Sequence, residues 1–428
     1  MKPRVSIVGL GYVGLVHAVG FASLGYMVVG YDIDSSKLEK LSQGKPTIYE
    51  EGLEEALARA LASGNLRFTN SVEEAVLETD VTFIAVGTPS LPDGSVDLSQ
   101  VESALRSIGR ALKLKGGWHL VAIKSTVPPG TTEGLARRIL EEESGLKAFE
   151  DFGLAANPEF LREGTALRDF YKPDRVVIGV RDERSKRVLL ELYEPIDSPK
   201  IVTTPTVAEL AKYASNVFLA VRISLANEIA SVSKALGVDA YEVLRIVGLD
   251  HRIGPHYLKP GLGFGGSCLP KDLKAFIKVA ESLGVNARIA RAALEVNEEQ
   301  PRRLVELLEK RVGDLRGRRV GVLGLAFKPG TDDIRESRAL EVIKLLLERG
   351  ATVYAHDPRA AEKAREALGG KVTIVGNPQE LIDTVDVVVI ATEWPEYENL
   401  DYRGKIVVDG RRVEKARREA RIYESLTC

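Results

Sequence analysis

Short apolar runs alternate with longer helical stretches through the first half of the chain. The apolar runs, which are rich in Val and Ile, occupy residues 4–8, 26–31, 81–86, 119–123, 154–156 and 175–180. Stretches long enough to form a helix separate most of them. Strands that alternate with helices in this way predict a mostly parallel sheet whose two faces are covered by helices.

The pattern changes near residue 205. Thr206 and Glu209 have the spacing of a helix capping box, and no Pro or Gly follows until Gly237. Apolar side chains then recur with a helical period, and charged and amide side chains in the same stretch exclude a membrane span. We therefore expect a helix over 207–236, about 45 Å long, that links two domains or packs against a second subunit.

The opening pattern returns in altered form after residue 311. The runs that match the first half of the chain lie at residues 319–324, 351–357 and 385–392. The sequence Gly-Leu-Ala-Phe-Lys-Pro at 324–329 replaces the glycine-rich turn of the first copy. The chain is thus expected to be an α/β protein in which a helical central domain (205–311) joins two doubly wound domains (1–204 and 312–428) with different ligands.

Charge and cysteine content exclude several classes of protein. The 59 Lys and Arg against 61 Asp and Glu give a net charge of -2, so no global charge favours nucleic acid or an anionic membrane. No apolar run approaches the ~20 residues of a membrane span, and residues 1–4 lead directly into a strand rather than a signal peptide. Two cysteines exclude a disulfide framework, and the five histidines show no metal-ligand spacing. We expect a cytoplasmic protein without a metal.

A glycine-rich turn at the start of the chain points to a dinucleotide. Gly9, Gly11 and Gly14 follow a strand and open a helix, as the G-x-G-x-x-G turn of a Rossmann domain does. Asp32 closes the next strand, where an acid binds the ribose hydroxyls and favours NAD over NADP. Lys37 is close enough to meet the adenosine side, although a solvated lysine is the simpler interpretation of that residue.

A second glycine-rich stretch, residues 261–272, carries a cysteine. Pro270 fits the first turn of a helix over 270–283, which places Cys268 at a helix N-terminus beside Lys271. Both neighbours favour a thiolate, whereas a lone cysteine is ordinarily a small buried hydrophobe. Lys212 and Asn216, four residues apart, share one face of the long helix. They form either a solvated patch or a pair that stabilises an oxyanion in a cleft.

Four motifs together resemble the UDP-glucose/UDP-mannuronate dehydrogenase family. They are Gly-Leu-Gly-Tyr-Val-Gly at 9–14, Asn-Pro-Glu-Phe-Leu-Arg-Glu-Gly at 157–164, Gly-Phe-Gly-Gly-Ser-Cys-Leu-Pro-Lys-Asp at 263–272 and Phe-Lys-Pro-Gly-Thr-Asp-Asp-Ile-Arg-Glu-Ser at 327–337. They stand in the expected order and cover essentially the whole chain.

The resemblance implies an NAD-dependent, four-electron oxidation of UDP-glucose to UDP-glucuronate. Asp272, with a water near Thr126, is the implied base, and Cys268 forms a thiohemiacetal and then a thioester. Lys212 and Asn216 would hold the oxyanion, and Glu159 would activate the hydrolytic water. The division of base roles among Asp272, Lys212 and Glu159 stays open.

The resemblance also implies a set of binding residues. Those for NAD are Gly9, Gly11, Tyr12, Val13, Gly14, Asp32, Lys37, Gly87, Thr88, Pro89, Ser125, Thr126, Glu163, Lys271 and Arg335. Those for the UDP-sugar are Glu159, Phe160, Leu161, Lys212, Asn216, Arg252, Phe264, Gly265, Gly266, Phe327, Lys328 and Arg411. Arg252 would reach the sugar site of the partner subunit in a homodimer.

Three other functions compete with this one. A UDP-N-acetylhexosamine dehydrogenase uses the same chemistry, but that branch typically carries Val and His where this chain has Phe264 and Ser267. Phe264 would narrow the loop against an acetamido group. A two-electron β-hydroxyacid dehydrogenase needs neither a nucleophilic cysteine nor a second α/β domain. A regulator that binds NAD without chemistry would produce no NADH.

Overall fold

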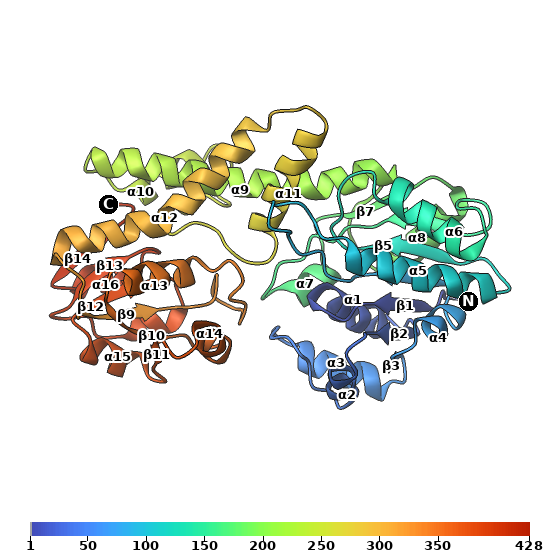
Figure 1. Ribbon diagram of the computed structural model, residues 1–428, viewed down its shortest axis with the longest axis horizontal. Coiled ribbons are helices and arrows are strands. Elements are labelled where there is room, and N and C mark those ends of the chain that lie inside the picture. The colour runs from blue at the N-terminus through green and yellow to red at the C-terminus, as the bar shows by residue number, and fades with distance from the viewer. Residues whose placement is uncertain (1) are drawn as a thin grey trace. The chain divides into compact units, whose positions relative to one another are not determined.

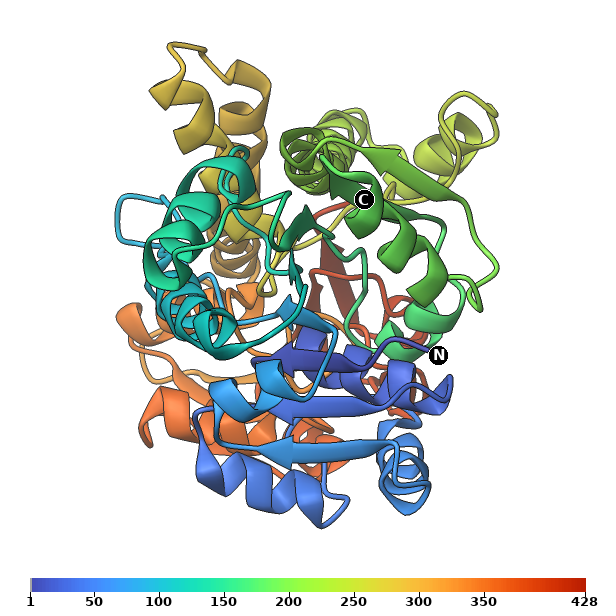
Figure 2. The same cartoon turned by 90° about the vertical axis from the view of Figure 1, so that its right-hand side faces the viewer.

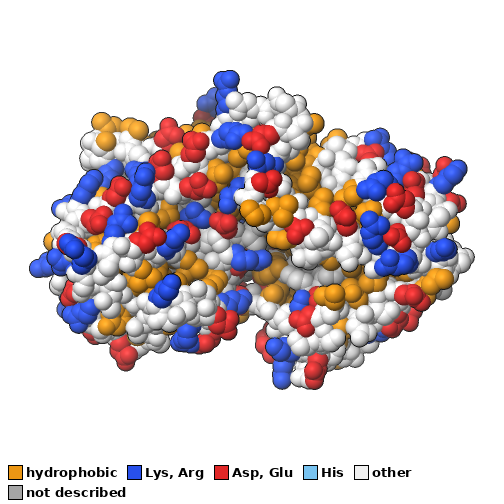
Figure 3. Space-filling view, in the orientation of Figure 1, with side chains coloured by type: hydrophobic (Ala, Val, Ile, Leu, Met, Phe, Trp, Pro, Cys, Tyr) orange, Lys and Arg blue, Asp and Glu red, His pale blue; other side chains and the backbone are white. Residues whose placement is uncertain are grey.

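The computed structural model describes residues 2–428, which form two compact units, 2–215 and 216–428 (Figure 1). The boundary falls inside one long helix, α9 (Pro205–Ala235). None of the helices in the described part of the chain is long and apolar enough to cross a membrane. Basic and acidic side chains are interspersed over the face seen in Figure 3.

The first unit is built on one twisted sheet (Figure 2). Residues 2–215 form eight strands in the order β3-β2-β1-β4-β5-β6-β7-β8, and every neighbouring pair is parallel except β6–β7. The strands are β1 (Val5–Val8), β2 (Val28–Tyr31), β3 (Leu66–Thr69), β4 (Val81–Ile84), β5 (Leu120–Ile123), β6 (Gly153–Ala156), β7 (Val176–Val180) and β8 (Lys200–Thr203). The mostly parallel sheet is confirmed. The sequence pattern missed β3 and β8, the two edge strands, which carry polar residues and lack a continuous apolar run.

Helices cover both faces of this sheet. They are α1 (Tyr12–Ser23), α2 (Ser35–Ser42), α3 (Leu53–Ala62), α4 (Val72–Leu77), α5 (Ser99–Leu114), η1 (Thr132–Ala136), α6 (Arg137–Ser144), α7 (Ala166–Tyr171) and α8 (Glu183–Leu192). One core includes α1, α3 and α8, and a separate core includes α5 and α6. Two cores on one sheet are the arrangement expected of a doubly wound domain.

The long helix α9 begins two residues earlier than the apolar pattern predicts. The predicted capping box is wrong, because Thr206 and Glu209 both lie inside the helix. Thr206 Oγ1 donates to Glu133 Oε2 at 2.7 Å, and Glu209 accepts from the amides of Gly130 and Thr132 at 2.6 and 2.8 Å. These two side chains therefore attach α9 to the segment 130–133.

The second unit holds another doubly wound sheet, as predicted. Residues 216–428 form six parallel strands in the order β11-β10-β9-β12-β13-β14. The strands are β9 (Arg319–Leu323), β10 (Thr352–His356), β11 (Thr373–Ile374), β12 (Val387–Ile390), β13 (Ile406–Asp409) and β14 (Ile422–Ser425). The helices are α10 (Ala240–Gly248), α11 (Leu269–Ser282), α12 (Arg288–Val312), α13 (Arg338–Glu348), α14 (Ala361–Leu368), α15 (Pro378–Thr384), η2 (Pro395–Asn399) and α16 (Glu414–Glu419).

A similar turn follows β1 in the first sheet and β9 in the second, but side chains fill only the second turn. Gly324 adopts a φ of +92°, close to the +95° of Gly9. Asp357, at the position equivalent to Asp32, accepts from the amides of Leu325 and Ala326 at 2.7 and 2.9 Å and from the Trp394 indole at 3.1 Å. The second turn is filled, because Ala326 stands at the position of Gly11 and is fully buried.

Candidate active site

Each glycine of the first turn is required for a different physical reason. Gly9 has a φ of +95°, and a side chain there would meet the backbone of Val86. A Cβ on Gly14 would overlap the carbonyl of Gly9, so the helix can pack closely only without one. A Cβ on Gly11 would project into space that no other described atom occupies within 4 Å. The amides at the start of α1 are therefore accessible to a phosphate.

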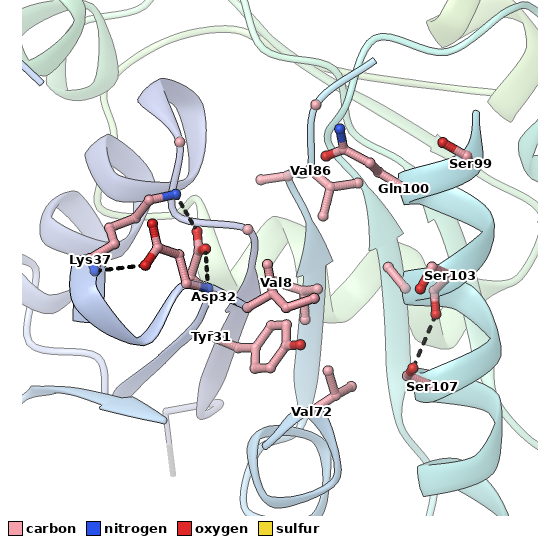
Figure 4. Close-up of a pocket in the computed structure, with 17 residues that line it drawn as sticks. Val8, Tyr31, Asp32, Lys37, Val72, Val86, Ser99, Gln100, Ser103 and Ser107 are labelled. Atoms are coloured by element: carbon pink, nitrogen blue, oxygen red, sulfur yellow. Dashed lines mark hydrogen bonds and ion pairs between the residues drawn. The ribbon is translucent and has the colours of Figure 1, made fainter. Parts of the chain in front are cut away.

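A cavity of about 460 Å³ adjoins this turn (Figure 4). Asp32 lines it and is 6% exposed. Its carboxylate accepts from the Leu10 amide at 2.9 Å and from the Lys37 ammonium at 2.8 Å. Lys37 is thus paired with Asp32 in the cavity wall, and its interpretation as a merely solvated lysine is wrong. NAD fits this site, which combines the unfilled space at Gly11, the adjoining cavity and the Asp32 carboxylate in the cavity wall.

The facing wall of this cavity was not anticipated from the sequence. It is formed by Val72 and by one face of α5, which carries Ser99, Gln100, Ser103 and Ser107 (Figure 4). The three serines recur every four residues, so the helical spacing of small polar side chains was a usable signal. Elsewhere in the wall, the predicted residue Gly87 lines the cavity, and the Ser125 hydroxyl donates to the Val86 carbonyl at 2.7 Å.

A buried ion pair joins Glu159 to Lys212. Their Oε1 and Nζ atoms are 3.2 Å apart, and the two side chains are only 7% and 5% exposed. The predicted residue Phe160 packs beside them, with its ring 5.4 Å from the Lys212 ammonium, and the amide of Leu161 donates to Glu159. Lys212 is therefore not part of a solvated patch. Their pairing offsets part of the cost of burying both charges, and buried ion pairs of this kind occur at functional sites.

Thr126 and Lys212 line the same small cavity. It measures about 10 Å³ and is also lined by Ser125 and Glu209. That volume is close to the minimum that holds one water molecule, and these side chains supply polar partners for it. The structure thus brings Thr126 together with Lys212, and the water that would act with Asp272 near Thr126 stays a prediction.

The cysteine opens a helix, as predicted. Cys268 is exposed and caps α11, which begins at Leu269 rather than Pro270. The interpretation of Cys268 as a buried hydrophobe is wrong. One turn into α11, Asp272 is 1% exposed, accepts from Asn216 Nδ2 at 2.6 Å and is ion-paired with Lys271. Lys271 therefore directs its charge at Asp272, an arrangement that the sequence did not reveal.

Two buried asparagines hold the loop that carries the cysteine. Asn227 of α9 accepts from the Gly261 amide at 2.7 Å, and Asn297 of α12 accepts from the Phe264 amide at the same distance. Asn297 also donates to the Phe264 carbonyl at 3.0 Å. Sequence analysis assigned no role to either asparagine. In the sequence, each asparagine could have been recognised only as an amide side chain among apolar residues that recur with a helical period.

The Phe264 ring lies in the core of the second unit. It is 5% exposed and packs with Ala220, Leu273 and Ile277. The structure therefore does not support a steric role for this ring against an acetamido group.

Several predicted sugar-nucleotide residues adjoin the glycine loop within the second unit. A Cβ on Gly266 would meet the Phe327 ring, and a Cβ on Gly265 would overlap the Glu336 carbonyl. The Lys328 ammonium lies 5.6 Å from the Phe327 ring. The Leu262 amide donates to the Gly410 carbonyl at 2.8 Å, which places the next residue, Arg411, near the loop. These contacts gather residues from two of the four motifs and place Arg411 near them.

The remaining predicted residues are held by neighbours of their own unit. The hydroxyl of Tyr12 is bonded to Glu50 and accepts from the Gly164 amide at 2.8 Å, next to Glu163. Arg335 is paired with Asp333 at 2.6 Å. Arg252 is paired with Asp250 at 2.6 Å, and its side chain is 78% exposed. Val13 lies in the first turn of α1, and Thr88 and Pro89 lie in the loop that follows β4. Whether these residues bind ligands stays a prediction.

Three family models match successive parts of the chain. Residues 3–197 match the NAD binding domain of the UDP-glucose/GDP-mannose dehydrogenase family, residues 206–299 match its central domain, and residues 321–416 match its UDP binding domain.

Individual relatives match over the full length. The chain is 45% identical to the UDP-glucose 6-dehydrogenase AglM of Haloferax volcanii, over 99% of this chain and 100% of that protein. The structure of a UDP-glucose dehydrogenase from Pyrobaculum islandicum is similar with a TM-score of 0.98 and 62% identity, covering 100% of this chain and 98% of the other. A UDP-D-ManNAc dehydrogenase from Pyrococcus horikoshii is similar with a TM-score of 0.87 and 32% identity, covering 99% of each chain.

Proposed function

The chain belongs to the UDP-glucose/GDP-mannose dehydrogenase family, and on that premise we propose that it oxidises UDP-glucose to UDP-glucuronate. It is an NAD-dependent oxidoreductase with a UDP-binding domain. NAD, when bound, accepts a hydride from the reacting carbon in each of the two oxidations.

The observation that carries the proposal is the arrangement around Cys268. An exposed cysteine caps a helix, and one turn further on a buried carboxylate, Asp272, is held by the Asn216 amide. Oxidation of an alcohol to an acid requires that the intermediate aldehyde be retained, and a thiol does this covalently. A two-electron dehydrogenase has no need of such a thiol.

The first oxidation requires a proton acceptor for the primary alcohol. We assign this role to Asp272, acting with a water beside Thr126. Asn216 and Lys271 fix the orientation of the Asp272 carboxylate, and the cavity at Thr126 has room for one water.

The second oxidation begins with covalent capture of the aldehyde. Cys268 Sγ forms a bond to the aldehyde carbon, and the carbonyl oxygen becomes an oxyanion. The Lys212 ammonium and the second N–H of Asn216 stabilise that charge. Loss of a hydride from the resulting thiohemiacetal gives a thioester.

Hydrolysis of the thioester completes the reaction. Glu159, oriented by Lys212 and by the Leu161 amide, takes a proton from water as the water oxygen attacks the thioester carbon. The C–S bond then breaks and Cys268 leaves as a thiolate. The product is a carboxylate.

The choice of UDP-glucose rests on the relatives and on the cysteine loop. Two full-length relatives are named for UDP-glucose, and Ser267 replaces the His that is typical of the N-acetylhexosamine branch. We further propose that the chain has three domains and forms a homodimer. Phe218, Leu225 and Val232 of α9 leave an apolar stripe exposed, by 73%, 53% and 58%.

The test is an assay of purified protein with NAD and a panel of UDP-glucose, UDP-N-acetylglucosamine, UDP-N-acetylmannosamine and GDP-mannose. We expect the highest kcat/KM for UDP-glucose and about two NADH per sugar, because each of the two oxidations reduces one NAD. One NADH per sugar would instead identify a two-electron dehydrogenase. A higher kcat/KM for another sugar would reassign the substrate.

Variants of the cysteines test the covalent step. Cys268→Ala should abolish acid production and leave NAD binding intact, and Cys268→Ser should trap an acyl-enzyme that intact mass detects. Cys428→Ala is the matched control, because Cys428 is the other exposed cysteine and should be dispensable. Full turnover by Cys268→Ala would refute covalent catalysis.

A further inference from the structure

Lys124, directly after β5, is a buried lysine to which the proposed reaction assigns no role. Its side chain is enclosed by the first unit, and the residue is 3% exposed. The ammonium donates to the Asn157 carbonyl at 2.9 Å, to Asn157 Oδ1 at 2.8 Å and to the Tyr193 hydroxyl at 3.1 Å. Tyr193 in turn donates to Asn157 Oδ1 at 2.6 Å. All three ammonium donors are used, and two of them serve one residue.

Asn157 transmits this constraint to Glu159. Its amide donates to the Ile123 carbonyl at 2.8 Å and its Nδ2 to the Val177 carbonyl at 2.7 Å, so both ends of the residue are fixed. The Asn157 carbonyl, which accepts from Lys124, belongs to the peptide bond between Asn157 and Pro158. The proline ring fixes the φ angle of Pro158. Glu159 follows immediately. The path from the Lys124 ammonium to the Glu159 backbone therefore contains few free torsions.

The electrostatic surroundings of Lys124 include the same carboxylate. Burial lowers the pKa of Lys124 to about 7, the charge of Glu159 opposes this shift, and Lys212 adds to it. The other titratable groups around Lys124 line a cavity of about 30 Å³ with it: His17 of α1, Asp169 of α7, Arg175 before β7 and Tyr193 after α8. Glu159 lines this cavity as well, and its carboxylate is ion-paired with Lys212, so the charges of both lysines act on it.

We propose that Lys124 is a positioning residue that holds Glu159 in the orientation needed for thioester hydrolysis. The proposal rests on the function proposed above, because it presupposes an acyl-enzyme and Glu159 as the base that hydrolyses it. Without Lys124, the Asn157 carbonyl loses its ammonium donor, Asn157 Oδ1 retains only the Tyr193 hydroxyl of its two donors, and the Pro158 turn can move. A displacement of a base by about 1 Å can lower a rate by roughly 100-fold. The oxidation steps do not use Glu159 as a base, although its partner Lys212 serves the second of them, so hydrolysis should slow more than oxidation.

Accumulation of the acyl-enzyme distinguishes this role from a purely structural one. In Lys124→Met, we expect a rapid burst of about two NADH per site, a steady-state rate lowered roughly 10- to 100-fold, and an acyl-enzyme in the intact mass. Tyr193→Phe removes two hydrogen bonds of the network, those to Lys124 and Asn157, with little change in volume, and should show the same pattern more weakly. It also keeps the test decisive if Lys124→Met does not fold.

Lys115→Met is the matched control. The Lys115 ammonium also donates to backbone carbonyls, those of Val76, Leu77 and Thr79. None of its described hydrogen bonds involves Asn157 or Glu159. We expect it to lower Tm without accumulating acyl-enzyme. Glu159→Gln is the reference, and it should accumulate acyl-enzyme more strongly than Lys124→Met.

The outcomes separate the two proposals. If Glu159→Gln accumulates acyl-enzyme but neither Lys124→Met nor Tyr193→Phe does, the role of Lys124 is overturned and the proposed function stands. If burst and steady-state rates fall together in Lys124→Met, its role is merely structural and the proposal is again overturned. If Glu159→Gln shows no acyl-enzyme, the assignment of Glu159 fails and the inference fails with it.

Discussion

Asn216 donates from Nδ2 to Oδ2 of Asp272 at 2.6 Å, and both residues are buried. Asn216 lies on α9 and Asp272 in the first turn of α11, one turn after Cys268. The amide proposed to stabilise an oxyanion thus also orients the proposed base. One of its two N–H groups is occupied by Asp272, which leaves the other for the substrate.

This relationship predicts that replacing Asn216 affects catalysis more than cofactor binding. Asn216→Ala removes an oxyanion donor and releases Asp272, so kcat should fall by roughly 100- to 1,000-fold while the Kd for NAD changes little. Steady-state kinetics and NAD titration measure the two effects. A kcat within a few-fold of the unmodified enzyme would exclude Asn216 from both roles.

Asp32 and Lys37 predict how the nucleotide preference can be changed. Asp32→Gly removes the carboxylate that repels a 2′-phosphate and frees Lys37 from its ion pair. Combined with Ile33→Arg at an 85% exposed position in the cavity wall, it should raise kcat/KM for NADP relative to NAD. Ile33→Arg alone is the control, and it should change the preference less. If the unmodified enzyme already used both cofactors equally, the role of Asp32 would be wrong.

Arg252 provides a test of the proposed dimer. The residue is exposed in the single chain, as expected for a side chain that acts in a neighbouring subunit. Arg252→Ala and Cys268→Ala should each be inactive alone, but mixed chains should regain some activity, because one site of each hybrid dimer has both residues intact. Subunit exchange must be verified by mass. Inactive hybrids would contradict a role in the partner's site.

Asp409 predicts a pH-dependent difference in stability. It is buried at the end of β13 and accepts from the amides of Arg411, Arg412 and Val413, and burial raises the pKa of its carboxyl to about 6. The folded chain therefore binds this proton more tightly than the unfolded chain, whose carboxyl has a pKa near 3.8. Its contribution to the free energy of unfolding is largest below pH 4 and decreases as pH rises to 6.

Asp409→Asn removes that dependence. The substitution should lower the free energy of unfolding most at pH 4. The difference from the unmodified protein should be about 2–3 kcal/mol smaller at pH 7. Urea unfolding of both proteins at pH 4, 5, 6 and 7 gives the difference directly. A deficit that is the same at all four pH values would show that Asp409 does not titrate in this range.

Local pattern was enough to predict six strands of the first sheet, three strands of the second (β9, β10 and β12), the NAD turn and the helix that follows Cys268. The strands that it identified are buried and apolar, and the turn at Gly9 needs glycines for reasons of local backbone geometry and close packing. The edge strands β3 and β8 escaped because one side of an edge strand lies against solvent and does not require apolar residues. The capping box failed because Glu209 has better partners at Gly130 and Thr132.

The sequence by itself determined which side chains could do chemistry, since their types and motif spacing are carried by the chain. Only the tertiary structure decided which of them meet. Lys212 pairs with Glu159 across 53 positions, Asn216 with Asp272 across 56, and Lys124 with Asn157 across 33. No periodicity encodes such pairs, because they depend on how helices pack on sheets. Burial then makes each pairing obligatory, since an ammonium or carboxylate removed from water must find its partner inside the protein.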